Sequence, residues 1–490
     1  MSRTRIFLFI SLLVVISGAS EFILMNQTTS ATTVATTGSE VWLTLPDQSK
    51  KLSREADLTF TPGAEAPQGA YRIEIDETVQ YQRMEGFGAA MTDSSAWLLM
   101  RILSDRQREA VMRNLFTHEG DGIGLSYVRI PIGASDFALH DYSYDDMPRG
   151  ETDPDLEHFS INYDEAYIIP ALQMAQELNP QLRFMASPWS APGWMKSGGS
   201  LHGGTLLPEY YGAFSDYLVK FIQAYAEHGV TIDSLTPQNE PMFTTDGYPT
   251  MRISSDAETE LVRDHLGPAL RDAGLPTRIV VYDHNWDMYL YPMRVLGDPA
   301  AAAYIDGVAF HCYGGDVANQ SLIHDAYPDK NIWFTECSGG GWAVGFANNL
   351  SWNIRTLAIG NFRNWGNSML LWNLALDENS GPKNGGCQNC RGVVTVDQSS
   401  GEVTYNEEFY ILGHLSKLVD PGAYRVESTA YREGQPENVA FLNPDGSLVL
   451  VVHATQNVTF AVAWQGQHFD YTLPAGGVVT FKWNAPVSQN

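Results

Sequence analysis

Two glutamates stand out in this sequence because each follows a run that is typical of a β-strand. Glu240 closes Ser-Leu-Thr-Pro-Gln-Asn-Glu, and Glu336 closes Asn-Ile-Trp-Phe-Thr-Glu. An apolar strand that ends in a carboxylate places an acid at the rim of a sheet, where active sites are commonly built. Two acids that face one cavity can cleave a glycosidic bond. A single glutamate at a strand end could equally form an ion pair with an arginine. The prediction of glycosidic-bond cleavage therefore depends on finding two such glutamates.

The acids need a scaffold, and strand-like runs that alternate with helical periodicity supply one. This alternation predicts a (β/α)8 TIM barrel, in which every strand is followed by a helix. An open doubly wound sheet is the alternative, but no glycine-rich phosphate-binding turn follows a strand. The 96 residues between Glu240 and Glu336 correspond to three strand-helix units, which assigns the acids to strands 4 and 7. The predicted strands are 85–93, 126–133, 182–190, 234–241, 278–286, 307–315, 331–340 and 367–377.

Both ends of the chain have a different pattern from the barrel. Alternating apolar and polar runs, separated by turns such as Asn443-Pro444-Asp445-Gly446, predict a β-sandwich that is built from the two ends. The predicted domains are a signal peptide or N-terminal anchor (1–25), a disordered Thr/Ser-rich linker (26–40), N-terminal sandwich strands (41–84), the barrel (85–414) and the C-terminal sandwich (415–490).

The N-terminus has the pattern of an export signal. Arg3 and Arg5 precede an apolar stretch over 6–16, and Ser17-Gly18-Ala19 offers small residues for cleavage. We therefore expect a secreted or extracytoplasmic protein, with an uncleaved anchor as the alternative. The formal net charge of −27 has the wrong sign for nucleic-acid binding.

Four cysteines are too few to build a fold from disulfides. Cys387 and Cys390 form a Cys-x-x-Cys pair in a loop rich in glycine and asparagine. In an exported protein this spacing favours a local disulfide, with free thiols as the alternative. We expect no metal, because a second ligand pair is missing, and no cofactor.

Five sequence blocks, in order along the chain, resemble glycoside hydrolase family 30, which comprises retaining β-glycosidases on a (β/α)8 barrel. The resemblance extends from about residue 85 to the C-terminus and is strongest to the glucosylceramidase type. The blocks cover 128–137, 186–196, 236–241, 334–337 and 372–377.

The resemblance implies a role for the residues that match these blocks. Glu240 would act as general acid and then general base, with a raised pKa, and Glu336 would be the ionised nucleophile. Asn239 would bind the sugar 2-hydroxyl, and Arg129 would keep the nucleophile charged. The remaining residues implied to bind substrate are Asp136, Phe137, Trp189 and Trp372, together with Tyr313 as a donor to the nucleophile.

The sequence departs from the family pattern on the side of the leaving group. Cys312 stands where the lysosomal member has tryptophan, and the loop over 377–393 differs throughout. Strand 5 ends with Asp283, His284 and Trp286, which we expect on the leaving-group side. By residue type alone, His311 is a core histidine.

These observations predict an exported retaining β-glycosidase that is directed at β-glucose and resembles glucosylceramidase. Its substrate would be a glycolipid, an oligosaccharide or a glucan. Membrane contact is expected only through an uncleaved leader or a lipid substrate. An endo-β-1,6-glucanase of the same family is the alternative, and the run Gly247-Tyr248-Pro249-Thr250-Met251 is compatible with it. A glycan-binding protein without catalysis is the alternative from a different class.

Overall fold

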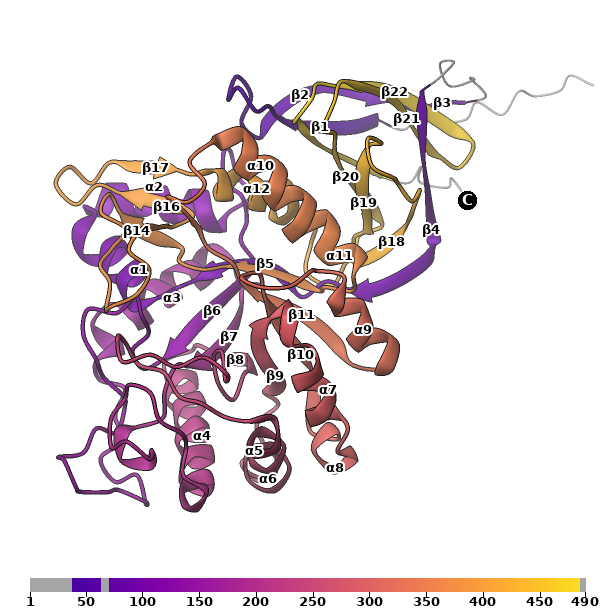
Figure 1. Cartoon of the computed structure of the whole chain (residues 1–490). Coiled ribbons are helices and arrows are strands. Elements are labelled where there is room, and N and C mark those ends of the chain that lie inside the picture. The colour runs from indigo at the N-terminus through magenta and orange to yellow at the C-terminus, as the bar shows by residue number, and fades with distance from the viewer. Residues whose placement is uncertain (1–37, 63–69, 485–490) are drawn as a thin grey trace, which may run out of the picture. The chain divides into compact units, whose positions relative to one another are not determined.

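The computed structural model describes residues 38–62 and 70–484 (Figure 1). The leader predicted over 1–25 and most of the linker predicted over 26–40 lie outside the described residues. Strand β1 (Gly38–Thr44) begins inside the predicted linker, so the last three residues of that prediction are wrong. None of the helices described in these two ranges is long and apolar enough to cross a membrane.

Eight parallel strands form the central barrel, which confirms the predicted fold class. β13 pairs with β5, and the Asn367 amide donates to the Ile332 carbonyl at 2.8 Å, which joins β13 to β11 and closes the ring. The strands are β5 (Gly86–Ala90), β6 (Tyr127–Ile132), β7 (Arg183–Pro188), β8 (Ile232–Leu235), β9 (Arg278–Asn285), β10 (Ile305–His311), β11 (Asn331–Glu336) and β13 (Ser368–Leu371).

Strand β8 is shorter than the sequence predicts, because it ends at Leu235 rather than at residue 241. Pro237 has no amide hydrogen to donate to a neighbouring strand, and the chain leaves the sheet at this point. Thr236 and Asn239 still donate their amides to Ala186 and Pro188 of β7. Glu240 therefore lies on a loop that follows the strand, not at the strand's last position.

Helices surround the barrel (Figure 1). Helices α3 (Ile168–Leu178) and α4 (Tyr211–Glu227), which follow β6 and β7, each bury an apolar stripe. The other α-helices are α1 (Asp93–Trp97), α2 (Asp105–Phe116), α5 (Ser255–Glu260), α6 (Gly267–Asp272), α7 (Leu290–Leu296), α8 (Pro299–Ala302), α9 (Asn319–Ala326), α10 (Phe346–Asn353), α11 (Asn361–Arg363) and α12 (Glu407–Ser416). Helix α1 is capped by Thr92, whose hydroxyl accepts from the Ser95 amide at 3.1 Å.

The interior of the barrel is a packed core, as expected for eight strands. Its side chains come from six strands and form a separate cluster of Tyr127, Met185, Val280, Ala309, Trp333 and Leu370. A larger cluster lies between the strands and the surrounding helices. The filled interior leaves the C-terminal ends of the strands as the place where polar side chains can gather.

The two chain ends build one ten-stranded sheet beside the barrel. β1 pairs with β23, and β4 pairs with both β18 and β21. Trp464 of β21 and Trp483 of β23 lie far apart in the strand order, yet their rings are 6.1 Å apart, so the sheet folds over a shared core as a sandwich. Its longer strands are β1, β2 (Ser53–Thr59), β4 (Tyr71–Arg83), β18 (Tyr424–Ser428), β19 (Glu437–Leu442), β20 (Ser447–His453), β21 (Val458–Trp464), β22 (Gln467–Leu473) and β23 (Val478–Asn484).

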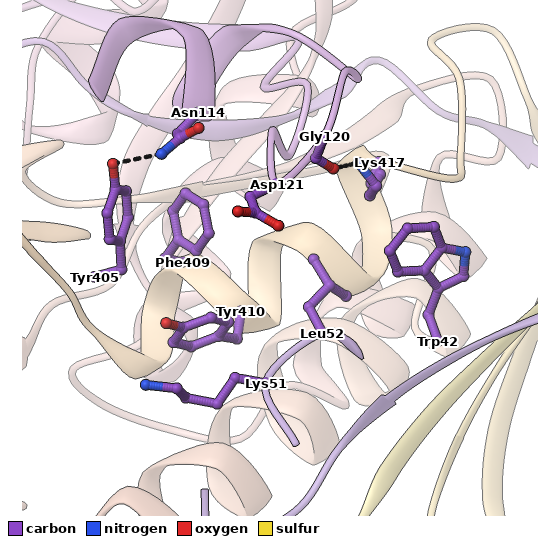
Figure 2. Close-up of a pocket in the computed structure, with 10 residues that line it drawn as sticks. All are labelled: Trp42, Lys51, Leu52, Asn114, Gly120, Asp121, Tyr405, Phe409, Tyr410 and Lys417. Carbon is purple, nitrogen blue, oxygen red and sulfur yellow. Dashed lines mark hydrogen bonds between the residues drawn. The ribbon is translucent and has the colours of Figure 1, made fainter. Parts of the chain in front are cut away.

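A buried histidine joins helix α12 to both ends of the sandwich. The two ring nitrogens of His414 lie 2.8 Å from the hydroxyls of Thr44 and Thr480. Burial lowers the pKa of His414 to about 3. A cleft of about 260 Å³ opens near this junction and is lined by Trp42, Lys51 and Tyr410 among others (Figure 2).

We expect the free energy of unfolding to fall as the pH drops below about 6.5. In the unfolded chain His414 binds a proton below that pH, whereas in the folded protein it stays neutral down to about pH 3. At pH 4.5 this single group would cost about 2–3 kcal/mol of unfolding free energy. Urea denaturation of wild type and His414→Gln at pH 7.5 and pH 4.5 measures it. The variant should lose less stability than wild type between the two pH values, and equal losses would contradict the assignment.

Candidate active site

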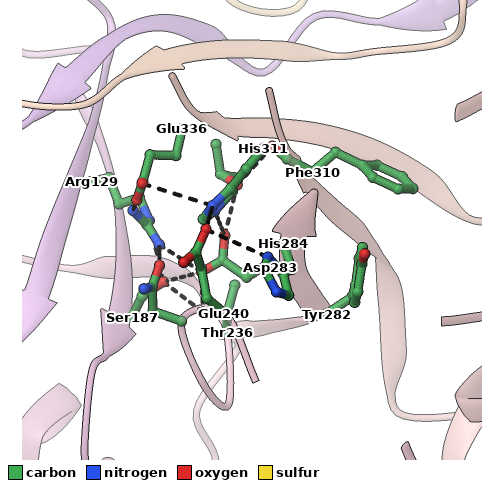
Figure 3. A network of polar contacts seen from close by, with 12 residues as sticks. Arg129, Ser187, Thr236, Glu240, Tyr282, Asp283, His284, Phe310, His311 and Glu336 are labelled. Atoms are coloured by element: carbon green, nitrogen blue, oxygen red, sulfur yellow. Dashed lines mark hydrogen bonds and ion pairs between the residues drawn. The ribbon is translucent and has the colours of Figure 1, made fainter. Parts of the chain in front are cut away.

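The carboxylates of Glu240 and Glu336 meet at the C-terminal ends of the barrel strands (Figure 3). One oxygen from each, together with a ring nitrogen of His311, lie within 4.8 Å of one another. Enzymes that invert the anomeric carbon need roughly 6.5–9.5 Å between their carboxyl groups to admit a water, whereas double displacement uses about 5–5.5 Å. The observed spacing therefore suits direct attack by one carboxylate on a sugar that lies between them.

The backbone at Glu240 is in the left-handed region, with a φ of +46°. Residues with a side chain seldom adopt this conformation, and it persists where surrounding contacts impose it. Here the Glu240 amide donates to the carbonyl of Asp283 at 3.0 Å. Asp283 and the preceding Tyr282 also have positive φ values, of +52° and +80°. The loop after β8 and the end of β9 thus hold each other in the geometry that aims Glu240 at Glu336.

Arg129 of β6 is fully buried and contacts both halves of the site (Figure 3). Its guanidinium donates to Glu336 Oε2 at 2.5 Å and to Asn239 Oδ1 at 2.6 Å. It also pairs with Asp283 at 2.7 Å. Burial raises the pKa of Glu336 above its usual value, although His311 and Arg129 oppose the shift. Arg129 therefore lies where it can orient the nucleophile candidate and favour its charged form.

Asp283 lies beneath the site, so its expected place on the leaving-group side is wrong. Oδ2 accepts from Arg129, Ser187 and Thr236, and Oδ1 accepts from His311 and Thr335. Burial raises the pKa of Asp283, but Arg129 and His311 outweigh it and hold the pKa well below its usual range. An aspartate in an otherwise apolar strand was the signal for such an anchor.

Of the other two residues expected on the leaving-group side, His284 reaches the site and Trp286 does not. Trp286 is buried, stacks on Phe334 and donates its ring N–H to Gln320 at 2.7 Å, so it takes no part in the site. His284 does reach the site, since its Nδ1 lies 3.4 Å from Glu240 Oε1. Tertiary packing, which the sequence does not reveal, decides between the two.

His311 connects the two catalytic candidates to Asp283 rather than serving only as a core residue. Its Nε2 lies 2.9 Å from Asp283 Oδ1 and its Nδ1 lies 3.1 Å from Glu240 Oε1. Burial alone would lower the pKa of His311, but the negative charges of Glu336 and Asp283 raise it to about 9. The imidazole therefore carries a proton that points at Glu240.

The pKa of Glu240 is the reverse of the sequence expectation. Burial raises it, but the nearby His284 and a hydrogen bond from His311 outweigh burial and lower the pKa of Glu240 to about 2. The prediction of a raised pKa treated Glu240 as an isolated buried acid and missed the two histidines. In the substrate-free protein the shared proton therefore resides on His311, one hydrogen bond away from Glu240.

Tyr313 follows β10 and donates its hydroxyl to Glu336 Oε1 at 3.0 Å. The same hydroxyl lies 3.1 Å from the Ser338 hydroxyl. Cys312, directly before Tyr313, forms a disulfide with Cys337, directly after Glu336. This bridge, which the cysteine spacing does not predict, ties the ends of β10 and β11 together beside the candidate nucleophile.

The remaining predicted sugar-binding residues lie near Arg129, which contacts Glu336 Oε2, whereas Tyr313 contacts Oε1. Phe137, Trp189 and Trp372 are buried in one small cluster. Trp189 and Trp372 stack on each other with ring centroids 4.8 Å apart, and the Arg129 guanidinium lies 4.9 Å from the Trp189 ring. At most one face of each tryptophan is thus left for a sugar.

Asp136 has a carboxylate oxygen that is free to accept a hydrogen bond from a ligand. Its Oδ1 is buried and has no hydrogen-bond partner among residues 38–62 and 70–484. Burial, followed by the negative charge of Glu336, raises the pKa of Asp136 well above its usual value. Buried polar atoms normally have partners, so an unpaired one near the two catalytic candidates fits a group that contacts sugar hydroxyls.

The loop that departs from the family pattern forms part of this wall. Cys387 and Cys390 are joined in a disulfide, and both pack against the cluster of Phe137, Trp189 and Trp372. Gly386 lies so close to Asp136 that a Cβ atom there would meet Oδ2 at 2.6 Å. The loop's glycine and disulfide therefore pack directly against Asp136 and the aromatic cluster.

Glu240, His311 and Glu336 also have the donor spacing of a possible metal site. Their donors are already engaged, since Arg129 and Tyr313 contact Glu336 and His311 carries a proton. Two adjacent positive charges disfavour a cation at this position. The arrangement suits acid and base chemistry by the carboxylates.

Comparison with known proteins agrees with the geometry. A model described as the glycosyl hydrolase family 30 TIM-barrel domain matches residues 84–419, and one described as the glycosyl hydrolase family 30 beta sandwich domain matches 422–481. An endo-1,6-beta-D-glucanase of Neurospora crassa is 34% identical over 450 residues, which cover 86% of this chain and 91% of that protein. Lysosomal acid glucosylceramidase of Mus musculus is 30% identical, with 82% of each chain covered.

Among solved structures, an endo-beta1,6-glucanase superposes with a TM-score of 0.85 at 33% identity, covering 91% of this chain and 99% of that one. The family models together match both the barrel and the sandwich in the order seen here. The two carboxylates at the mouth of the barrel, the sandwich built from both ends and these matches lead to one conclusion: the chain is a glycoside hydrolase and belongs to glycosyl hydrolase family 30.

Proposed function

We propose that the chain is an exported retaining β-glycosidase that hydrolyses β-1,6-linked glucan. The close approach of the two carboxylates, which place one oxygen each within 4.8 Å of the other, carries the proposal of retention. The choice of glucan over glycolipid rests on the relatives, since proteins named as endo-1,6-beta-D-glucanases reach 34% identity over 86% of the chain. Glucosylceramide is the second candidate, because putative glucosylceramidases of Caenorhabditis elegans reach 32% identity.

In the proposed mechanism Glu336 attacks the anomeric carbon while Glu240 protonates the leaving oxygen. The glycosyl-enzyme ester that results is hydrolysed by a water from which Glu240 takes a proton. The first proton reaches Glu240 from His311 Nδ1, which is 3.1 Å away, and Asp283 fixes the other ring nitrogen. Asn239, whose Oδ1 is occupied by Arg129, turns its amide nitrogen toward the sugar 2-hydroxyl.

Export is proposed from two features. The N-terminal pattern of Arg3, Arg5 and the apolar stretch over 6–16 is typical of a secretory leader. The four cysteines form two disulfides, which persist in oxidising compartments outside the cytosol. Mass spectrometry of the protein from the culture supernatant of an expressing host tests this, and a chain retained in the cytosol with its leader would contradict it.

We expect the wild-type protein to release the β-anomer first from a gentio-oligosaccharide, with the α-anomer appearing only by mutarotation. NMR of the anomeric protons during the first minutes measures this. Assays of gentio-oligosaccharides, glucosylceramide, an aryl β-glucoside and a β-xyloside in parallel identify the substrate. Initial release of the α-anomer would rule out retention, and turnover of the xyloside alone would rule out glucose.

A further inference from the structure

A second cavity is lined by Tyr313, whose hydroxyl donates to Glu336 Oε1 at 3.0 Å. It has a volume of about 500 Å³ and lies between the ends of β10 and β11 and helix α10. The two oxygens of Glu336 face different sets of residues, the paired tryptophans on one side and this cavity on the other. Oε2 faces Arg129, on which Trp189 packs, and Oε1 faces Tyr313, which lines the second cavity.

The walls of this cavity are aromatic and open to solvent. Trp342 is 56% exposed, Trp352 is 46% exposed and Tyr313 is 45% exposed. The two tryptophans are the most exposed of those in the described parts of the chain. Large apolar rings left in solvent beside an active site are typical of a binding surface. Pyranose rings present C–H groups that pack on such rings.

The backbone holds Trp342 firmly in place. Strand β12 (Gly339–Gly340) pairs with β15 (Cys390–Arg391), and the Gly341 amide donates to the Asn389 carbonyl at 2.7 Å. The Trp342 ring lies directly over Gly340, where a Cβ atom would meet it at 2.2 Å. On the neighbouring wall the Cys312–Cys337 disulfide lines the cavity. A ligand therefore meets a surface that is already formed, which lowers the entropic cost of binding.

Polar groups interrupt the aromatic walls and indicate what the cavity holds. The hydroxyl of Ser338 and the carboxamide of Asn348 lie on its lining. An alkyl chain laid over them would cut them off from water without offering a hydrogen bond, which is unfavourable. The hydroxyls of a sugar would satisfy them. The volume is also that of a site for one small ligand rather than for two long acyl chains.

We propose that this cavity binds the glucosyl residue on the leaving-group side of the bond that is cut. The proposal rests on the proposed function, because it assigns the paired tryptophans and Asp136 to the sugar that is attacked. Tyr313 and Ser338 then belong to both subsites, since their hydroxyls contact each other and the Tyr313 hydroxyl contacts Glu336. Long gentio-oligosaccharides gain contacts there that a substrate with a very small leaving group cannot reach.

The test compares Trp342→Ala and Trp352→Ala with wild type on gentiotetraose and on β-glucosyl fluoride, whose leaving group is a single atom. Each variant should lower the ratio of the two kcat/KM values by roughly five- to tenfold. Tyr424→Ala, an aromatic of 39% exposure on sandwich strand β18, is the matched control and should leave the ratio unchanged. Turnover of the fluoride also reports that each variant is folded.

Binding of gentiotetraose to Glu336→Gln, with and without Trp342→Ala, is measured by calorimetry and does not depend on turnover. A loss of affinity supports the cavity even if the wild type hydrolyses no β-glucoside, a result that would overturn only the proposed function. An unchanged kcat/KM ratio together with unchanged affinity would overturn the cavity proposal. A selective loss on glucosylceramide would show that the occupant is a lipid and would overturn the sugar assignment.

Discussion

Glu336→Gln is expected to lower kcat on a β-glucoside by at least about four orders of magnitude, equivalent to more than about 5 kcal/mol of barrier. The amide cannot form the ester with the anomeric carbon, and it leaves Arg129 without the carboxylate that lies 2.5 Å from its guanidinium. Because glutamine has nearly the same shape, substrate binding should persist. Steady-state and single-turnover kinetics on gentiobiose measure the loss.

Glu85→Gln is the control for loss of a buried carboxylate elsewhere. Glu85 is 6% exposed and pairs with Arg183 and Arg278, which are the first residues of β7 and β9 and so lie at the end of the barrel away from the site. It should lower stability without a comparable loss of kcat. A 2-deoxy-2-fluoro-glucosyl donor should label wild type on Glu336, as peptide mass mapping would show. Labelling of another residue would refute the assignment of the nucleophile.

Glu240→Ala is expected to reduce kcat/KM for gentiobiose by about 10²–10⁴-fold, the usual range for a lost general acid. A dinitrophenyl β-glucoside needs no protonation of its leaving group, so formation of its glycosyl-enzyme should be much less affected. Hydrolysis of that intermediate also needs Glu240, as base, so the intermediate should accumulate. A burst of dinitrophenol followed by slow turnover is the signature to measure.

Azide separates this role from simple disruption of the site. In Glu240→Ala the anion can enter the vacated space, attack the intermediate without a base and release β-glucosyl azide. His284→Ala provides a comparison, because it removes a neighbour of Glu240 at 3.4 Å but keeps the acid. Equal damage to gentiobiose and the activated glucoside, with no azide product, would contradict the acid and base role.

Much of the fold follows from sequence patterns because the barrel strands are largely apolar runs, and β9, β10 and β11 end in polar residues. Residues 331–336 were predicted within such a run and form β11. Glu240 was harder to place, because its loop geometry depends on the positive φ at Asp283 and on a hydrogen bond to β9. Local sequence does not encode contacts between residues more than forty positions apart.

The polar network under the site was the part that the sequence did not reveal. His311 is by composition a core histidine, and only its two partners, Asp283 and Glu240, make it a carrier of charge. The expected pKa of Glu240 was wrong for the same reason. The Cys312–Cys337 bridge was missed because the two residues are 25 positions apart on different strands, whereas Cys387 and Cys390 are close in sequence.

The sandwich has a consequence for how the chain is made. β23 lies between β1 and β20 in the sheet. The edge of β1 that pairs with β23 therefore stays uncovered until the C-terminal end of the chain has been synthesised. During synthesis the barrel segments emerge after β1 and before β23, so β1 remains an open edge that is prone to pair wrongly until the end of synthesis. Shortening the protein before Val478 would leave two such edges at once, and aggregation during biogenesis would follow even with every residue of the catalytic pocket in place.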